Sequence, residues 1–405
     1  MTTNKKPITI RLPLSACLSI RIILFLFFNL FVITTCVKQH DIEPEITEIE
    51  EPAAEIDPDY LRVREIVLGM DERLLAAQVL ISGIDGAGNL ANNTIDLLTE
   101  IPTGGIMLFK YNLNIDNDSI RNMLTQTKAV ISAESKVEPF ICVDHEGGTV
   151  NRFQSGVLSL PSAITYWEFS KDAGMEAALV KIENDSFKDA VVLNSLGINM
   201  NLAPIAENLN DDNRVFLSRR SYGPNPVFVS LACNAFIMGM EKAGVLCVVK
   251  HFPGSAGADP HYSKSILNLK GGELDELVLP FSYLIKNGTR AIMAAHTFIP
   301  ALDSEIATLS PVVMRNWLRD GLGFDGIIIS DDFIMAAAGG LPPEAAAVKS
   351  LSAGSDMILV WPRDLKKTHS AIITALENET LSRERLEDAA HRIIYRKLKM
   401  GITQR

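Results

Sequence analysis

The feature that most constrains the fold is a series of eight short apolar runs, spread from residue 78 to residue 360. Each run is dominated by β-branched or other aliphatic residues, which is typical of parallel strands covered on both faces. The runs are Gln78–Ser82, Gly105–Phe109, Pro139–Val143, Ile198–Leu202, Val245–Val249, Ala291–Ala295, Gly326–Ser330 and Asp356–Val360.

Longer amphipathic segments separate most of these runs and have the length of crossover helices. They are 120–132, 176–196, 226–243, 273–286 and 311–320, and a last helix is expected over 382–400. Eight strand–helix units in about 340 residues predict an α/β fold, a (β/α)8 TIM-type barrel, over residues 61–405. A doubly wound open sheet is the alternative, because a count from sequence can miss or add a strand.

The N-terminus predicts export from the cytoplasm. Basic residues precede an apolar stretch, 22–35, which is shorter than the roughly 20 residues that span a bilayer and has the length of a signal-peptide core. Residues 1–35 are therefore expected to be a signal peptide or membrane anchor, and the acidic residues 36–60 a flexible tether. Ile33-Thr34-Thr35-Cys36 is similar to a bacterial lipoprotein box, which would make Cys36 the lipidated residue. An uncleaved signal anchor is the alternative, and both place the protein in the cell envelope, attached to a membrane.

Composition excludes several classes of function. The net charge of −11 leaves no obvious phosphate-binding face, so we expect no nucleic-acid partner. None of the five cysteines forms a C-x-x-C pair, and three of them lie in apolar runs, which indicates buried thiols. We expect neither a metal nor a cofactor, since no metal-ligand spacing or phosphate-binding glycine loop is present.

Polar clusters follow five of the predicted strands. In a barrel of this kind the catalytic residues lie on loops at the C-terminal ends of the strands. The clusters are residues 144–152 after the third strand, 219–223 after the fourth, 250–261 at the fifth, His296 after the sixth and 330–332 at the end of the seventh. Their shared placement predicts one active site at that end of the barrel.

The stretch from about 70 to 400 resembles glycoside hydrolase family 3, specifically its single-domain β-N-acetylglucosaminidase branch. The matching motifs are D-x-E-G-G-x-V-x-R (144–152), R-S-[FY]-G (220–223), K-H-F-P-G followed by D-x-H (250–261), A-H-x-x-x-P-A-L-D (295–303) and G-F-D-G-[IV]-[IV]-x-S-D-D (323–332). The resemblance implies a barrel enzyme that removes terminal β-linked N-acetylglucosamine from cell-wall fragments or other glycans, with retention of configuration.

The resemblance also implies the roles of individual residues. Asp331 matches the catalytic nucleophile, and His261 with Asp259 matches the general acid/base and the carboxylate that orients it. The positions that bind the terminal sugar are matched by Asp144, Arg152, Arg220, Lys250 and His251. An imidazole suits the acid/base role, because its ordinary pKa near 6.5 allows it to donate and to accept a proton around neutrality.

Two places depart from the family pattern. The family has Gly-His-Gly after the Pro, and its D-x-H pair begins eleven residues past the Lys; here Asp259 comes nine residues past Lys250, and Pro260 stands between Asp259 and His261. The loop that carries the acid/base is therefore shorter and, because Pro fixes its φ, locally stiffer. Arg219 replaces an acidic residue, so that Arg219 competes with Arg220 for the sugar-binding position. Asp332 likewise stands beside Asp331, although the family places the nucleophile directly after the Ser.

Three functions follow from these residues. A hydrolase acting as a monomer without a cofactor is the first. A β-N-acetylglucosaminide phosphorylase is the second, because an imidazole acid/base does not repel phosphate as a carboxylate would. A surface lipoprotein that binds a glycan or another partner and has lost catalysis is the third, and the altered loop is its support.

Overall fold

The computed structural model describes residues 57–153, 158, 160–257, 259–268, 273–335 and 340–403. The predicted signal peptide or anchor (1–35), Cys36 and residues 37–56 of the tether lie outside these ranges. Within them, no helix is both long and apolar enough to cross a membrane.

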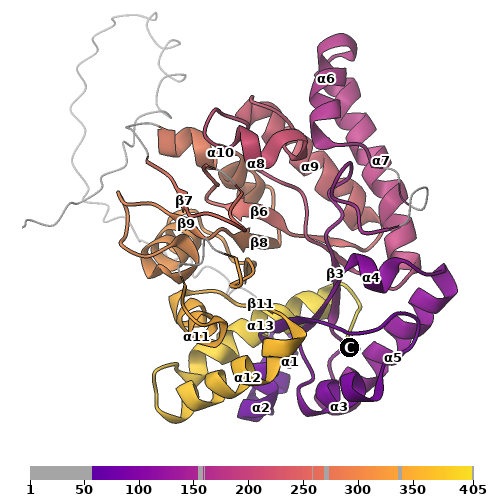
Figure 1. The fold of residues 1–405 in the computed structure, drawn as a ribbon, viewed down its shortest axis with the longest axis vertical. Helices are drawn as coiled ribbons and strands as arrows, with labels where there is room; N and C mark the ends of the chain where they lie inside the picture. The colour runs from indigo at the N-terminus through magenta and orange to yellow at the C-terminus, as the bar shows by residue number, and fades with distance from the viewer. Residues whose placement is uncertain are drawn as a thin grey trace, which may run out of the picture. The chain divides into compact units, whose positions relative to one another are not determined.

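Parallel strands form the centre of the domain (Figure 1). One sheet has the order β11-β1-β2-β3-β4-β5 and a second has the order β10-β8-β6, and all of these pairings are parallel. The strands are β1 Leu80–Gly83, β2 Gly105–Leu108, β3 Phe140–Val143, β4 Met200–Asn201, β5 Leu246–Cys247, β6 Val249–Phe252, β8 Ala291–Ala294, β10 Ile327–Ser330 and β11 Ile358–Val360.

Two bridges join these sheets into a closed barrel. Ile205 pairs with Lys250 between the fourth and fifth barrel positions, and Ile329 pairs with Met357 between β10 and the residue before β11. β5 and β6 are consecutive pieces of one barrel strand, separated by Val248. The eight predicted strands and their TIM-type closure are therefore confirmed, and the open sheet is excluded. A short outer pair, β7 (Ser265–Ile266) with β9 (Thr297–Phe298), lies beyond the barrel strands.

Helices follow the strands as predicted. The six expected helices correspond to α5 (Asn117–Ser135), α7 (Met175–Ser195), α9 (Pro226–Lys242), α10 (Glu273–Lys286), η3 (Val312–Gly321, with π-helical hydrogen bonds) and α13 (Arg383–Lys399). The others are α1 Pro58–Leu68, α2 Glu72–Gln78, α3 Asn92–Glu100, α4 Lys110–Leu113, α6 Ala163–Ala173, α8 Arg214–Leu217, α11 Pro343–Ala353 and α12 Pro362–Glu377, with short 3-10 turns η1 (Ser218–Arg220) and η2 (Ala307–Leu309).

The folded domain begins earlier than the predicted boundary at residue 61. Asp57 caps α1 by accepting a hydrogen bond from the Asp59 amide, and Pro58 occupies the first helical turn, where its missing N–H costs nothing. Tyr395 and Lys399 of α13 both donate to Asp57. Figure 1 shows α1 and α13 side by side near the C-terminus. The last residues of the predicted tether thus belong to the first helix, because α13 holds them.

Side chains alternate between two buried layers along the barrel strands, as expected for strands covered on both faces. The registered partners Met107, Cys142, Met200 and Leu246 fall in one apolar cluster. Ile106, Ile141, Ile292 and Ile328 fall in the other cluster, which includes residues of α5, α7 and α9. The three cysteines of this part of the chain, Cys142, Cys233 and Cys247, are buried free thiols, as predicted.

Candidate active site

The predicted polar residues meet at the C-terminal end of the barrel. Asp144 directly follows β3, Lys250 and His251 lie within β6, and Asp331 directly follows β10. Because parallel strands end at the same rim, segments more than a hundred residues apart in the chain are brought into contact there: Lys250 Nζ is 2.9 Å from Asp144 Oδ1.

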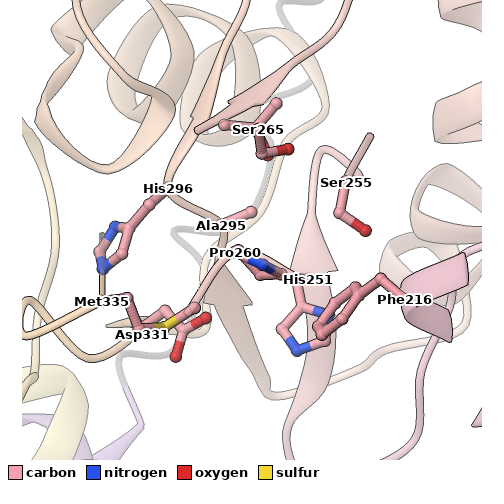
Figure 2. Close-up of a pocket in the computed structure, with 10 residues that line it drawn as sticks. Phe216, His251, Ser255, Pro260, Ser265, Ala295, His296, Asp331 and Met335 are labelled. Carbon is pink, nitrogen blue, oxygen red and sulfur yellow. The ribbon is translucent and has the colours of Figure 1, made fainter. Parts of the chain in front are cut away.

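A pocket at this rim contains Asp331 (Figure 2). Asp331 and His251 both line it, together with Phe216, Ser255, Pro260, Ser265, Ala295, His296, Thr297 and Met335. In Figure 2, Asp331 and His296 lie on one side of the pocket, and His251 and Phe216 on the other. Asp331 thus presents a carboxylate to a concave space whose opposite wall is an imidazole.

Adjacent Asp332 is turned to other partners. Its Oδ2 accepts a hydrogen bond from Trp361 Nε1 at 2.5 Å, and its Oδ1 accepts one from the Ile334 amide at 3.0 Å. Burial raises the pKa of Asp332. Of the two carboxylates it is Asp331 that lines the pocket, and this favours Asp331 as the nucleophile.

His296 contacts the backbone directly after β10. Its Nε2 donates to the backbone carbonyl of Asp332 at 3.0 Å, and its Nδ1 accepts from the Thr308 hydroxyl at 2.7 Å. Burial lowers the pKa of His296, so that the imidazole is neutral and keeps this tautomer. The contact fixes the backbone of the two aspartates.

A second group of charges lies beside the pocket and contains four of the five predicted sugar-binding residues; the fifth, His251, lines the pocket itself. Lys250 bridges Asp144 and Glu146, at 2.9 and 2.7 Å. Arg152 donates to Asp144 at 3.0 Å, and Arg220 makes two parallel hydrogen bonds to Glu146 at 2.8 and 2.9 Å. The structure therefore brings Asp144, Arg152, Arg220 and Lys250 together, as predicted.

The charges in this network stabilise one another. Burial opposes ionisation of Glu146, yet Lys250 and Arg220 hold the pKa of Glu146 well below its ordinary range. Burial also opposes ionisation of Asp144, but Lys250 and Arg152 lower its pKa. Burial disfavours the charged form of Lys250 as well, and here the two carboxylates outweigh it and raise the pKa. All three groups are therefore ionised at neutral pH, and the network presents charged hydrogen-bond donors and acceptors in fixed positions.

The competition between Arg219 and Arg220 is resolved by their contacts. The Arg220 side chain contacts Glu146 and is 18% exposed, whereas the Arg219 side chain is 53% exposed and donates to the Thr165 hydroxyl at 3.2 Å. Arg220 therefore belongs to the charge network of the site.

Asp259 and His261 form the predicted pair. Asp259 Oδ1 is 2.6 Å from His261 Nδ1 and also accepts from the His261 amide at 2.9 Å. Burial acts against the charge of Asp259, but these hydrogen bonds lower its pKa, so that Nδ1 carries the proton and Nε2 is left for another partner. The His261 side chain is 59% exposed, whereas Ser255 and Pro260 of this loop line the pocket.

Two carboxylates of the site, Glu146 and Glu207, were not predicted from the sequence. Glu146 lies inside the first motif, and its pairing with two cations becomes evident only when the strands are assembled. Glu207 follows the fourth strand by a few residues, and this position after a strand, which it shares with the other polar residues of the site, could have identified it from the sequence. It is fully buried and lies 2.7 Å from His251 Nδ1.

Comparison with known proteins agrees with this geometry. Residues 69–395 match the model of the glycosyl hydrolase family 3 N-terminal domain. A β-hexosaminidase of Methylococcus capsulatus is 34% identical over 296 residues, which cover 71% of this chain and 83% of that protein. One of Neisseria gonorrhoeae is 35% identical over 267 residues, covering 64% of this chain and 72% of that one.

Solved structures are similar over most of the chain. A family 3 β-N-acetylglucosaminidase from Paenibacillus sp. superimposes with a TM-score of 0.75 at 28% identity; the alignment covers 82% of this chain and 63% of the length of that protein. NagZ from Neisseria gonorrhoeae, in complex with N-trifluoroacetyl-D-glucosamine, superimposes with a TM-score of 0.68 at 28% identity. The alignment covers 78% of this chain and 89% of that one.

The barrel, the carboxylate pocket at its C-terminal rim and these matches define the class of protein as a glycoside hydrolase. The chain belongs to glycoside hydrolase family 3.

Proposed function

We propose that this protein is a retaining exo-β-N-acetylhexosaminidase that removes terminal β-linked N-acetylglucosamine from cell-wall fragments or other glycans. The observation that carries the proposal is the pocket in which Asp331 faces His251, beside the network of Lys250, Asp144 and Arg220. The names of the similar proteins, β-hexosaminidase and β-N-acetylglucosaminidase, support the choice of sugar.

In the first step, an Asp331 carboxylate oxygen bonds to the anomeric carbon while the bond from that carbon to the leaving oxygen breaks. His261 gives its Nε2 proton to the leaving oxygen, and ionised Asp259 stabilises the imidazolium before transfer. In the second step, water bonds to the anomeric carbon, gives a proton to His261 Nε2, and the bond to Asp331 breaks. Two displacements retain the configuration of the sugar.

The substrate-binding roles follow from the charge network. Asp144 is an acceptor, whereas Arg152, Arg220 and Lys250 are donors. The network is held by internal ion pairs before any sugar enters, so that little reorganisation opposes binding. Hydrogen bonds of this kind accelerate the reaction to the extent that they strengthen in the transition state.

His261 is the residue whose position must change in this mechanism. Its exposed side chain extends from the loop that begins at Gly254, and Pro260 reaches the pocket instead. We propose that the loop brings His261 Nε2 to the glycosidic oxygen once the terminal sugar is bound, as the resemblance to the family implies.

The proposed activity is tested by release of 4-nitrophenol from its β-N-acetylglucosaminide, with the β-glucoside and the α-anomer as controls. We expect hydrolysis of the first only, with the β-anomer of the free sugar appearing first by NMR. His261→Ala should lower kcat on substrates with poor leaving groups by about 10²- to 10⁴-fold, the usual contribution of general acid catalysis.

Two other outcomes would contradict this proposal. A sugar 1-phosphate formed in phosphate buffer, with faster turnover than in its absence, would identify a phosphorylase. If the folded protein binds glycans but hydrolyses neither aryl glycosides nor cell-wall fragments, it is a binding protein.

We further propose that the protein acts as a monomer at the cell envelope, attached through lipidated Cys36. The sequence 33–36 and the apolar stretch before it support the anchor. Cys36→Ser should move the protein from the detergent-soluble membrane fraction to the aqueous phase and abolish incorporation of labelled palmitate. Unchanged partitioning without any label would instead indicate an uncleaved signal anchor.

A further inference from the structure

Glu207 joins two parts of the site that the proposed mechanism treats separately. Its side chain has no exposed surface. One carboxylate oxygen, Oε1, lies 2.7 Å from His251 Nδ1. The other, Oε2, accepts two hydrogen bonds from Ser255, one from the amide and one from the hydroxyl, both at 2.6 Å. His251 lines the Asp331 pocket, and Ser255 is the second residue of the loop that begins at Gly254 and carries Asp259 and His261.

The ionisation of Glu207 determines the tautomer of His251. Burial acts against the charge, but the hydrogen bonds and the field of His251, together with the Ser255 donors, lower the pKa of Glu207 below its ordinary value. An ionised carboxylate accepts hydrogen bonds only, so that the proton of the pair is on His251 Nδ1. The other ring nitrogen, Nε2, is thereby left for the pocket, much as a buried aspartate orients the histidine of a serine-protease triad.

The backbone on both sides of Glu207 is also held firmly. The Ala206 amide donates to the Lys250 carbonyl at 2.7 Å, and the Glu207 carbonyl accepts from the Ser221 hydroxyl at 2.6 Å. Ser221 is the neighbour of Arg220. The backbone of Glu207 is therefore anchored to the strand that carries Lys250 and to the segment that carries Arg220, while its carboxylate binds His251 and Ser255.

Other hydrogen bonds also hold the described start of the acid/base loop, and the first of them runs from the Thr297 hydroxyl to the Gly254 carbonyl at 2.8 Å. Beyond Ser255, the Ala256 amide donates to the Ser265 hydroxyl at 3.0 Å and the Gly257 amide to the Asp212 carbonyl at 2.7 Å. Of these hydrogen bonds, the two that Ser255 donates to Glu207 are the shortest. Their acceptor is a carboxylate, whereas the others end on neutral oxygens, so these two are the strongest.

We propose that Glu207 is a positioning residue: it sets the tautomer of His251 and holds the start of the acid/base loop, so that it acts on protonation of the leaving group through His261. This inference rests on the proposed function, since it assigns Glu207 to the same reaction.

The test is Glu207→Gln, which keeps the shape of the side chain but replaces one oxygen by an NH2 group. If the amide oxygen stays with the two donors of Ser255, the NH2 donates to His251 Nδ1 and the proton moves to Nε2. We expect 15N NMR of histidine-labelled protein to show this change of tautomer at His251, which is a readout that a merely structural role would not produce.

Kinetics provide the second readout. A leaving group that needs no protonation, 2,4-dinitrophenol, should be released with a loss of less than about 10-fold in kcat/KM, whereas a sugar leaving group should show a loss of about 100-fold, within the range of general acid catalysis. Ser255→Ala removes the hydrogen bond from the Ser255 hydroxyl to Glu207 and leaves the contact between Glu207 and His251 intact. It should give a smaller leaving-group effect with the His251 tautomer unchanged.

Asp189→Asn is the matched control. Asp189 is another buried carboxylate paired with an imidazole, His145 Nε2 at 2.8 Å, but it is not part of the Asp331 pocket. In Asp189→Asn, kcat/KM should depend on the leaving group in the same way as in the parent enzyme. Folded Glu207→Gln with an unchanged His251 tautomer and equal losses on all leaving groups would overturn the inference. A parent enzyme that hydrolyses no glycoside would instead overturn the proposed function, while the tautomer measurement would still test the contact with His251.

Discussion

Replacing Asp331 by Asn is expected to lower kcat on 4-nitrophenyl β-N-acetylglucosaminide by at least about 10⁴-fold, as for removal of a nucleophile in other covalent enzymes. The amide keeps the shape of the side chain and its contact with the Asp332 amide, 2.8 Å from Oδ1. What is lost is the charged oxygen that faces the pocket, and with it the covalent intermediate. Steady-state kinetics, with the fold checked by circular dichroism, measure the effect.

Asp332→Asn is the matched control for this prediction. The Asp332 carboxylate accepts hydrogen bonds from Trp361 and the Ile334 amide and does not line the pocket. The substitution Asp332→Asn should therefore lower kcat far less than Asp331→Asn does. Azide supplies a second check: Asp331→Gly leaves space for a small anion, which should restore turnover and give the α-glycosyl azide. Activity that survived in Asp331→Asn, or a larger loss in Asp332→Asn, would contradict the assignment of the nucleophile.

Replacing Lys397 by Met is expected to remove a pH-dependent part of the stability. Lys397 of α13 is fully buried at the N-terminal end of the barrel, where Nζ donates to Gln78 Oε1 at 3.2 Å and lies 5.1 Å from the centre of the Phe140 ring. Burial lowers the pKa of this amine from 10.5 to about 7. Between these two values the unfolded chain binds a proton that the folded protein does not, so the free energy of unfolding rises with pH across that window.

The size of this effect follows from the shift. One pKa unit corresponds to about 1.4 kcal/mol, so the parent should gain roughly 2 to 3 kcal/mol relative to Lys397→Met between pH 7 and pH 9. Urea unfolding of both proteins across this range measures the difference. Lys367→Met, at an exposed position of α12, is the control and should follow the parent at every pH. An equal pH dependence in Lys397→Met and the parent would show that the buried amine does not titrate in this window.

The strands were predictable because their signal is local. A parallel strand covered on both faces must be an apolar run, and each of the eight runs became a barrel strand, such as β3 within Pro139–Val143. The six expected helices were predictable for the same reason, whereas others, such as α3, α11 and α12, were not predicted. The start of the domain was not: Asp57 belongs to α1 because Tyr395 and Lys399, more than 300 residues away, bind it.

For the site, the residue types and their places at strand ends were legible in the sequence, and so was the family. Two pairs of adjacent residues, Arg219 with Arg220 and Asp331 with Asp332, could not be separated by residue type, and their contacts show which member belongs to the site. Arg220 rather than Arg219 binds Glu146, and Asp331 rather than Asp332 faces the pocket. Adjacent residues on a strand or turn point in different directions, so the backbone path is what separates them.

The sequence by itself determined the class of fold, the family and the chemistry that the site can carry, because apolar periodicity and motif spacing are properties of short segments. The tertiary structure alone decided how the charges are shared: Lys250 pairs with two carboxylates, Glu207 connects His251 to Ser255, and the His261 side chain is exposed at the rim. Those are interactions between segments distant along the chain, and burial sets their strength. Neither the distance between two segments nor the burial of a pair is determined until the barrel closes.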